Sequence, residues 1–363
     1  MLSNAAKKHS SDLNSLCTDL GTRSQIIVVS NRGPVSFRKI NDQKLAVRNQ
    51  SSSAMGSFSS ARGRLPLTWV SLAANEADRQ ALQNAGSGVI TQGLPKSWGA
   101  VFVPTSRRAY HRFYNVICNP LLWFLHHKCW GQTHTPNIDR AAHSAWDRGF
   151  VTVSNEISKN LVSLTTESEL PTSIFIRGYH MHLVVENIRS FIPNAIIHYT
   201  PGVPWPDLGE WEALPENWIA RIHRSLLSAN IISFPRDRDR GSFVSSVEEL
   251  FPDVKIDRAK WQAEQSVGPT LTVGHPSIDH QYFESIASSR RSIKEADSSK
   301  SKDSVHTFVM VDRAEPFRNV VRSLRAFEVM LSENSDYHRR VRYVLMLVPP
   351  SPHLAQYRRY VNE

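Results

Sequence analysis

Three arginines stand at positions where an α/β protein could hold a phosphate. Arg32 follows a continuous apolar run, residues 26–29, which is typical of a strand buried on both faces. Ligands of open α/β sheets bind at the carboxyl ends of strands, where a guanidinium can hold a phosphate through two hydrogen bonds. Arg313 and Arg318 flank Pro316, and a proline at this place predicts the start of a helix. Two cations beside a helix N-terminus favour the binding of an anion. The alternative is that all three arginines are solvated surface residues.

The segments around these arginines alternate between strand and helix patterns. Apolar, β-branched runs predict strands, and they lie within 25–37, 67–73, 172–180, 194–206 and 271–283, most of them followed by a turn. Runs with helical spacing lie between them, as in 108–129 and 141–165, the first of them interrupted at Asn119-Pro120. This alternation predicts a doubly wound parallel α/β sheet. Residues 38–66 are rich in Ser, Gly and Arg without any period, so we expect a mobile loop there.

Composition divides the chain into four parts. They are a polar leader, an N-terminal Rossmann-like domain, a Ser- and Lys-rich linker and the start of a second Rossmann domain, at 1–24, 25–287, 288–304 and 305–363. The last part shows a single βαβ unit, which cannot bury both faces of a parallel sheet. We therefore expect an incomplete second domain, whose unpaired sheet edge favours association with another copy or with a longer relative.

The composition of the 363 residues narrows the class of protein. The net charge of +10 permits a polyanionic or phosphorylated partner, but no zinc, RNP or helix-turn-helix signature supports nucleic-acid binding. Three cysteines without paired spacing exclude a disulfide framework and a cysteine metal site, which favours a reducing, cytoplasmic location. No apolar run reaches 18 residues, so we expect no membrane span, and the first 20 residues lack the apolar core of a secretory signal.

Six segments, taken in order, resemble the retaining trehalose-6-phosphate synthases, a family of glycosyltransferases with two facing Rossmann domains. The segments are IIVVSNRGPVSF, TWVSLA, RFYNVICNPLLWFLHH, FIRGYHMHLVVENIR, IIHYTPGVPWP and VMVDRAEPFRN. They resemble the family's SNR-x-P loop, its TWVGW and YYN-x-x-SN-x-x-LW segments, IHDYHL, FFLHIPFP and GR-x-D-x-x-KG. The PWP and NPLLWF variants are also similar to pseudo-glycosyltransferases that join cyclitols. Each match alone is weak, but six in order over roughly residues 25–360 are specific.

The resemblance implies a fold, substrates and roles for named residues. It implies a GT-B-type fold, a sugar-nucleotide donor such as UDP- or GDP-glucose, a sugar-phosphate acceptor such as glucose 6-phosphate, and neither a metal nor a cofactor. The implied acceptor-binding residues are Arg32, Trp69, Tyr114 and Trp123, and the implied donor-binding residues are Gly56, Arg313 and Arg318. The last two arginines are also the implied catalytic residues, because they neutralise the leaving diphosphate. Core packing is the alternative for the aromatic residues, and a Ser/Gly-rich loop is the alternative for Gly56.

Several positions depart from the family pattern, including Met55 in place of a glycine before Gly56 and Arg318 in place of a lysine. Gly178 stands where the family has the Asp that contacts the acceptor sugar, and Gly202 stands where it has the His near the reacting centre. Asp312 replaces a glycine beside the diphosphate site, and Pro352 replaces a further arginine. His180 and His198 could substitute in part for the lost polar groups. The sequence thus supports two hypotheses, an active synthase-type transferase and a catalytically impaired relative that acts as a sugar-phosphate-binding or regulatory partner.

Overall fold

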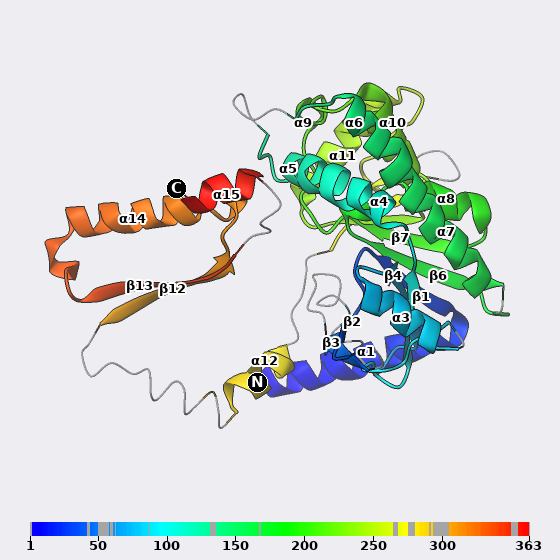
Figure 1. Ribbon diagram of the computed structural model, residues 1–363, viewed down its shortest axis with the longest axis horizontal. Helices are drawn as coiled ribbons and strands as arrows, with labels where there is room; N and C mark the ends of the chain where they lie inside the picture. The colour runs from blue at the N-terminus through cyan, green and yellow to red at the C-terminus, as the bar shows by residue number, and fades with distance from the viewer. Residues whose placement is uncertain are drawn as a thin grey trace. The chain divides into compact units, whose positions relative to one another are not determined.

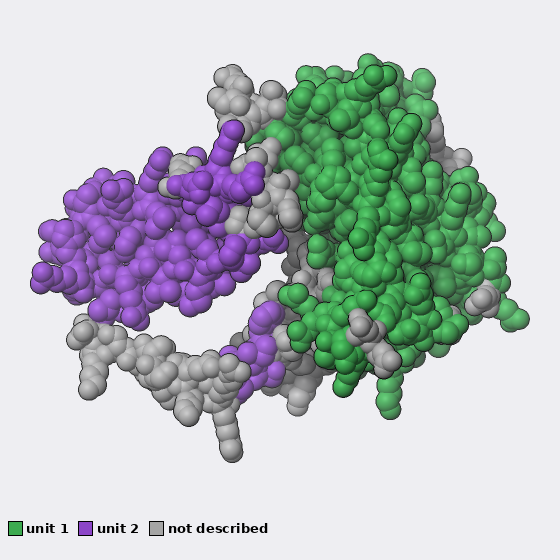
Figure 2. Space-filling model, viewed as in Figure 1, with its two compact units in different colours: residues 1–279 green, residues 280–363 purple. Residues whose placement is uncertain are grey.

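The computed structural model describes residues 2–41, 44–49, 58, 61, 63–86, 88–130, 136–166, 168–263, 268–274, 280–289, 292, 305–349 and 355–362. Gly56, Pro352 and most of the predicted linker lie outside these residues. The chain forms two compact units, Met1–Asp279 and His280–Glu363, which Figure 2 shows in green and purple. Each unit is an α/β structure, and we describe each by itself.

A nine-stranded sheet is the frame of the first unit. Its strand order is β5-β4-β1-β6-β7-β8-β11-β10-β9. The strands span β1 Gln25–Ser30, β4 Leu67–Leu72, β5 Trp98–Val103, β6 Thr172–Arg177, β7 Ile196–Thr200, β8 Ile231–Phe234, β9 Ile256–Asp257, β10 Gln262–Ala263 and β11 Thr270–Val273. The seven strands from β5 to β11 pair in parallel, and β10 and β9 add an antiparallel edge. The predicted parallel α/β fold class is therefore confirmed.

Helices cover the sheet on both faces because its central strands are apolar on both sides. In β1, Ile27 and Val29 belong to the large core, while Ile26 and Val28 belong to a second core on the opposite face. Figure 1 shows how the helices surround the sheet. The helical segments span α1 Leu2–Arg23, α3 Glu76–Asn84, α4 Arg107–Tyr110, η2 His111–Leu122, α5 Trp123–His126, α6 Arg140–Ala145, η3 Trp146–Val151, α7 Thr152–Thr165, η4 Tyr179–Met181, α8 Val184–Phe191, α9 Leu208–Trp211, α10 Glu216–Leu226 and α11 Asp237–Leu250.

The segment predicted as a polar leader forms α1. Leu13, Cys17 and Leu20 recur at helical spacing and pack into the second core of the sheet. The structure thus places this helix with the first unit.

The expectation of a mobile loop over 38–66 is wrong for its first part. Strands β2 (Val35–Lys39) and β3 (Leu45–Asn49) form an antiparallel hairpin. Leu45 and Val47 alternate with outward residues and pack against a small core that includes Phe37. The prediction failed because a two-residue alternation over one short strand was hidden in a segment with polar average composition.

The break predicted at Asn119-Pro120 is present. Asn119 has φ −122° and ψ 119°, outside the helical region, because a residue before proline is driven away from helical angles by the proline ring. Helix α5 follows directly and carries Trp123. The break therefore lies inside η2 and separates its first part, which carries Tyr114, from its last turn and α5, which carries Trp123.

The second unit contains the predicted βαβ unit. Its elements span α12 His280–Ala287, β12 His306–Arg313, η5 Pro316–Arg318, α14 Val320–Glu333, η6 Ser335–Tyr337, β13 Val341–Val348 and α15 Ala355–Asn362. Strands β12 and β13 pair in parallel. Helix α14 packs on one face of this pair through Phe327, whose ring lies 5.8 Å from that of Phe308 and 5.3 Å from that of Tyr343. Across the part of the chain that the structure describes, no helix is long and apolar enough to cross a membrane.

Candidate functional site

Three neighbouring strands end at the same edge of the large sheet. Strand β1 pairs with β6, and β6 pairs with β7, all in parallel. Arg32 follows β1, Gly178 follows β6 and Gly202 follows β7. The topology therefore brings together one predicted phosphate-binding arginine and the two glycines that depart from the family pattern. This is the edge at which parallel sheets bind ligands.

A row of rings runs from Arg32 to Trp123. The Arg32 guanidinium carbon lies 5.8 Å from the centre of the Tyr114 ring, and Tyr114 stacks on His180 at 5.7 Å and 4°. His180 lies 4.0 Å from Tyr179, which in turn lies 5.5 Å from Trp123. The structure thus joins Arg32, Tyr114 and Trp123 in one aromatic row through two rings that follow β6.

The sequence prediction did not assign Tyr179 and His180 to this row. His180 was named only as a substitute for a lost polar group. Both residues directly follow the apolar run of β6, and this position at a strand end was the available signal. The stacking itself could not be predicted, because it depends on η2 lying against η4.

The charge at this row is carried by Arg32. Burial and the Arg32 charge lower the pKa of His180 to about 3, so its imidazole is neutral at pH 7. Burial lowers the pKa of Arg32, but the Tyr114 and Tyr110 hydroxyls raise it by more, so the net shift is upward. Among the described residues of the row, Arg32 is the cation, and it lies beside apolar ring faces, a combination that suits a phosphorylated sugar.

Trp69 lies in the core. Its side chain is fully buried, its Nε1 donates to Ser30 Oγ at 2.8 Å, and its ring packs against Phe58 and Trp98. The face of β4 that carries Trp69 is the face that α1 covers. This placement agrees with the core-packing alternative, and a contact between Trp69 and a ligand stays a prediction.

Gly178 and Gly202 lie side by side. Gly178 has φ +96° and Gly202 has φ +69°, values that favour glycine because other side chains clash with their own backbone there. A Cβ atom on Gly202 would lie 3.9 Å from Gly178 Cα, and one on Gly178 would lie 3.4 Å from His180 Nδ1. The two departures from the family pattern are thus neighbours in space, and both backbones have the positive φ angles that favour glycine.

His198 is bonded within the sheet. Its Nε2 lies 2.7 Å from Ser233 Oγ, which lies 2.7 Å from Thr272 Oγ1. Burial and the charge of Arg177 lower the pKa of His198 to about 4. The His198 side chain is therefore neutral and is held by a residue of the neighbouring strand β8. That it substitutes for a polar group lost at Gly178 or Gly202 stays a prediction.

The two arginines of the second unit are paired with carboxylates. Arg313 Nε lies 2.9 Å from Glu315 Oε1, and Arg318 Nε lies 3.1 Å from Asp312 Oδ1. Glu315 is buried, and its burial raises its pKa although both arginines oppose the shift. Asp312, the residue that departs from the family's glycine, thus neutralises one of the two predicted diphosphate-binding cations.

The predicted helix start at Pro316 is displaced. Pro316 opens the short helix η5, and α14 begins only at Val320. Asn319 between them has φ +56°, a left-handed conformation that ends the first helix. Arg313 and Arg318 therefore both precede α14, and Arg318 ends η5 instead of standing in the first turn of a long helix.

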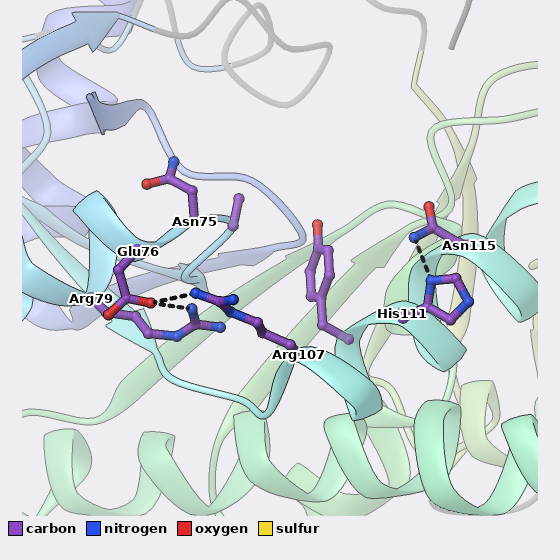
Figure 3. Close-up of a pocket in the computed structure, with 8 residues that line it drawn as sticks. Asn75, Glu76, Arg79, Arg107, His111 and Asn115 are labelled. Carbon is purple, nitrogen blue, oxygen red and sulfur yellow. Dashed lines mark hydrogen bonds and ion pairs between the residues drawn. The ribbon is translucent and has the colours of Figure 1, made fainter. Parts of the chain in front are cut away.

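A pocket of about 340 Å³ lies beside the aromatic row (Figure 3). Glu76 accepts hydrogen bonds from Arg79 at 3.1 Å and from Arg107 at 3.4 Å across this pocket. Tyr110 also lines it and stacks on Tyr114 at 5.7 Å. The sequence prediction did not include this pocket. Its two guanidinium groups share one carboxylate, so part of their charge is already neutralised.

Comparison with known proteins gives relatives over nearly the whole chain. A model of glycosyltransferase family 20 matches residues 24–363. A validamine 7-phosphate valienyltransferase of Streptomyces hygroscopicus is 24% identical over 277 residues, and an α,α-trehalose-phosphate synthase (UDP-forming) of Candida albicans is 24% identical over 346 residues. The first alignment covers 73% and the second 92% of this chain.

A solved structure shows the same fold. The N-terminal domain of a Candida albicans trehalose-6-phosphate phosphatase superposes with a TM-score of 0.74 at 19% identity, over 93% of this chain and 67% of that one. The matched region is 52% of the valienyltransferase and 67% of the Candida synthase. The chain thus spans about half of the valienyltransferase and about two thirds of each of the two Candida proteins.

Proposed function

The chain belongs to glycosyltransferase family 20, and from this premise we propose that it is a retaining glycosyltransferase of the trehalose-6-phosphate synthase type. In this proposal it transfers glucose from a sugar nucleotide, UDP- or GDP-glucose, to a sugar phosphate such as glucose 6-phosphate. Similarity to a UDP-forming trehalose-phosphate synthase supports this substrate class, and it favours UDP over GDP as the nucleotide.

One observation carries the proposal, the row that joins Arg32, Tyr114, His180, Tyr179 and Trp123. Arg32 can hold the acceptor phosphate through charge-assisted hydrogen bonds. The ring faces next to it can pack on the apolar C–H surface of a sugar. The neutral His180 and the Tyr114 hydroxyl can each exchange hydrogen bonds with sugar hydroxyls without adding a second charge.

The donor side of the proposal rests on Arg313 and Arg318. Transfer with retention proceeds on one face of the donor sugar, and the leaving diphosphate itself takes the proton from the attacking hydroxyl. Such a step needs no protein nucleophile but needs cations that neutralise the developing charge on the diphosphate. Arg313 and Arg318 can supply them if the diphosphate displaces Glu315 and Asp312 as their partners. Gly56, the further donor residue, lies outside the described residues.

A second candidate function is a catalytically impaired relative that binds a sugar phosphate or partners a full-length synthase. The left-handed conformations of Gly178 and Gly202 favour it, because the two polar side chains of the family pattern are absent from the place nearest the reaction. The loss of one hydrogen bond to a developing charge costs roughly 10²–10³ in rate. The fold also occurs in a protein named as a phosphatase, so the fold does not require synthase activity.

Calorimetric titration separates the two candidates. We expect the whole chain to bind glucose 6-phosphate and Arg32→Ala to weaken that binding at least tenfold, because a charge-assisted phosphate contact is lost. Binding of UDP-glucose together with release of UDP supports the transferase. Binding of glucose 6-phosphate alone supports the impaired relative. If glucose 6-phosphate does not bind, or if Arg32→Ala binds it equally well, the sugar-phosphate assignment is wrong.

A further inference from the structure

Below the aromatic row lies a cluster of buried polar rings that the proposed function does not use. His126 ends α5, His182 follows η4, and Tyr199 lies in β7. All three side chains are completely buried. Buried polar groups are stable only with hydrogen-bond partners, so the bonds within this cluster decide which nitrogen atoms carry protons.

The hydrogen bonds allow one proton arrangement for neutral rings. His126 Nδ1 lies 2.9 Å from the Pro204 carbonyl oxygen, which can only accept, so Nδ1 carries the proton and His126 Nε2 must accept. His126 Nε2 lies 3.1 Å from His182 Nε2, which therefore donates. His182 Nδ1 then accepts from the Tyr199 hydroxyl at 2.8 Å. The bonds run in one direction, from Tyr199 through His182 and His126 to Pro204.

Both imidazoles are neutral at pH 7. Burial lowers the pKa of His126 to about 3, and burial lowers that of His182 well below its usual value. The arrangement with one proton on each ring satisfies all four ring nitrogens.

This chain connects the three segments that carry the candidate site. His126 lies on the short helix of Trp123, and its ring lies 5.7 Å from Tyr179. Tyr199 Oη gives its one proton to His182 Nδ1, so its 3.4 Å approach to the Gly178 carbonyl oxygen is a contact beside that hydrogen bond. Pro204 stands two residues after Gly202. The segments after β6 and β7 and helix α5 are thus tied together by directional bonds directly below the ring row.

We propose that His126, His182 and Tyr199 are positioning residues, which hold Trp123, Gly178 and Gly202 in place relative to one another without touching a ligand. Apolar rings of the same size would fill the space but would leave the mutual orientation of the segments less defined. The effect on ligand affinity rests on the proposed function, whereas the effect on the protein alone does not.

The proton arrangement can be tested without any ligand. In ¹⁵N-labelled protein at pH 7, long-range ¹H–¹⁵N correlations of histidine rings report which nitrogen is protonated. We expect His126 in the Nδ1–H form and His182 in the Nε2–H form. The opposite tautomer at either ring, or a charged ring, contradicts the hydrogen-bond chain.

The positioning role is tested with Tyr199→Phe, which removes one hydroxyl and keeps the ring. Its matched control is Tyr343→Phe in the second unit, where the hydroxyl bonds Ser323 Oγ at 3.0 Å. We expect Tyr199→Phe to shift the backbone amide signals of Gly178 and Gly202 and the ring signals of His126, and Tyr343→Phe to leave them in place. Unchanged glycine signals in Tyr199→Phe would overturn the role.

Ligand binding then separates this inference from the proposed function. If the unaltered chain binds glucose 6-phosphate, we expect Tyr199→Phe to raise the dissociation constant about tenfold and Tyr343→Phe to leave it unchanged. Both variants are measured well below their unfolding temperatures. Equal affinity in both variants overturns the positioning role while the proposed function stands. If the unaltered chain does not bind glucose 6-phosphate, the proposed function fails, and the glycine amide signals alone decide the positioning role.

Discussion

The two units carry phosphate-binding candidates on very different supports. In the first unit, the strand residues beneath Arg32 are completely buried, as Val28 and Val29 show. In the second unit, large apolar residues of both strands are exposed, including Val309 and Val311 of β12 and Met346 and Val348 of β13. The first unit thus presents its candidate residues from a sheet covered on both faces, whereas the residues of β12 and β13 are half-buried or exposed, with α14 packed on one face.

The difference extends to the charges themselves. Arg32 lies beside neutral rings, while Arg313 and Arg318 each contact a carboxylate. A ligand phosphate at Arg32 meets a cation in place, but a diphosphate at the second unit must first displace two carboxylates. If the proposed assignment holds, the acceptor side is preorganised and the donor side requires rearrangement.

Acid should destabilise the first unit most strongly. His126, His182 and His223 are completely buried, and burial lowers the pKa of His126 to about 3 and that of His223 to about 4. The unfolded chain therefore binds more protons than the folded chain below pH 6.5, and stability falls as the pH falls. We expect each of these rings to lower the unfolding free energy of the protein by about 2 kcal/mol between pH 7 and pH 5.

Urea unfolding at several pH values, followed by tryptophan fluorescence, measures this loss. All nine tryptophans of the chain precede residue 279, so the signal reports the first unit. Replacement of His223 by Gln should remove part of the pH dependence. A flat unfolding free energy between pH 7 and pH 5 contradicts the prediction.

A matched pair of valines tests the difference in burial directly. Val29→Ala removes two completely buried methyl groups from β1 and should cost about 2–3 kcal/mol of unfolding free energy. Val311→Ala makes the same change on β12, where the side chain is 68% exposed, and should cost at most about 0.5 kcal/mol. Calorimetric melting of both variants gives the comparison. Equal costs would show that Val311 is covered.

Substitution of Gly178 and Gly202 tests whether the side chains of the family pattern can be restored at these positions. Gly178→Asp and Gly202→His restore the residues of the family pattern, but both backbones are left-handed. We expect each change to cost about 1–3 kcal/mol of stability. Gly241→Ala, in helix α11 with open space around it, is the control and should stabilise by roughly 0.5–1 kcal/mol.

Activity measured in these glycine variants, and in a double variant that carries both Gly178→Asp and Gly202→His, distinguishes the two candidate functions. An increase in UDP release by the double variant, despite its lower stability, supports the placement of Gly178 and Gly202 at the reacting centre. No increase in a folded double variant argues against that placement.

The smallest expected effect comes from the exposed ion pair of the second unit. Arg318→Met removes the partner of Asp312, and both side chains are partly exposed, so the cost should lie between about 0 and 1 kcal/mol. Arg313→Met leaves the buried Glu315 without its ion-pair partner and should cost more, about 1–3 kcal/mol. Thermal melting at pH 7 measures both variants. A larger cost for Arg318→Met reverses the expected order.

Local patterns in the sequence were sufficient for several features. The apolar run before Arg32 predicted a buried strand with this arginine after its carboxyl end, and proline at 120 predicted the break before α5. Hairpin β2–β3 was missed because its alternation covers only Leu45–Asn49. The helix start at Pro316 was misplaced because nothing in the local pattern predicted a left-handed Asn319.

The sequence by itself determined the alternation of strands and helices, the family resemblance and the residue types at the strand ends, because these depend on neighbours a few positions apart. Only the tertiary structure decided that Trp69 is a core residue, that His180 stacks on Tyr114 and that Gly178 lies against Gly202. These pairs are brought together by sheet pairing and helix packing between distant segments. Contacts of that kind depend on the whole fold, and no short pattern contains them.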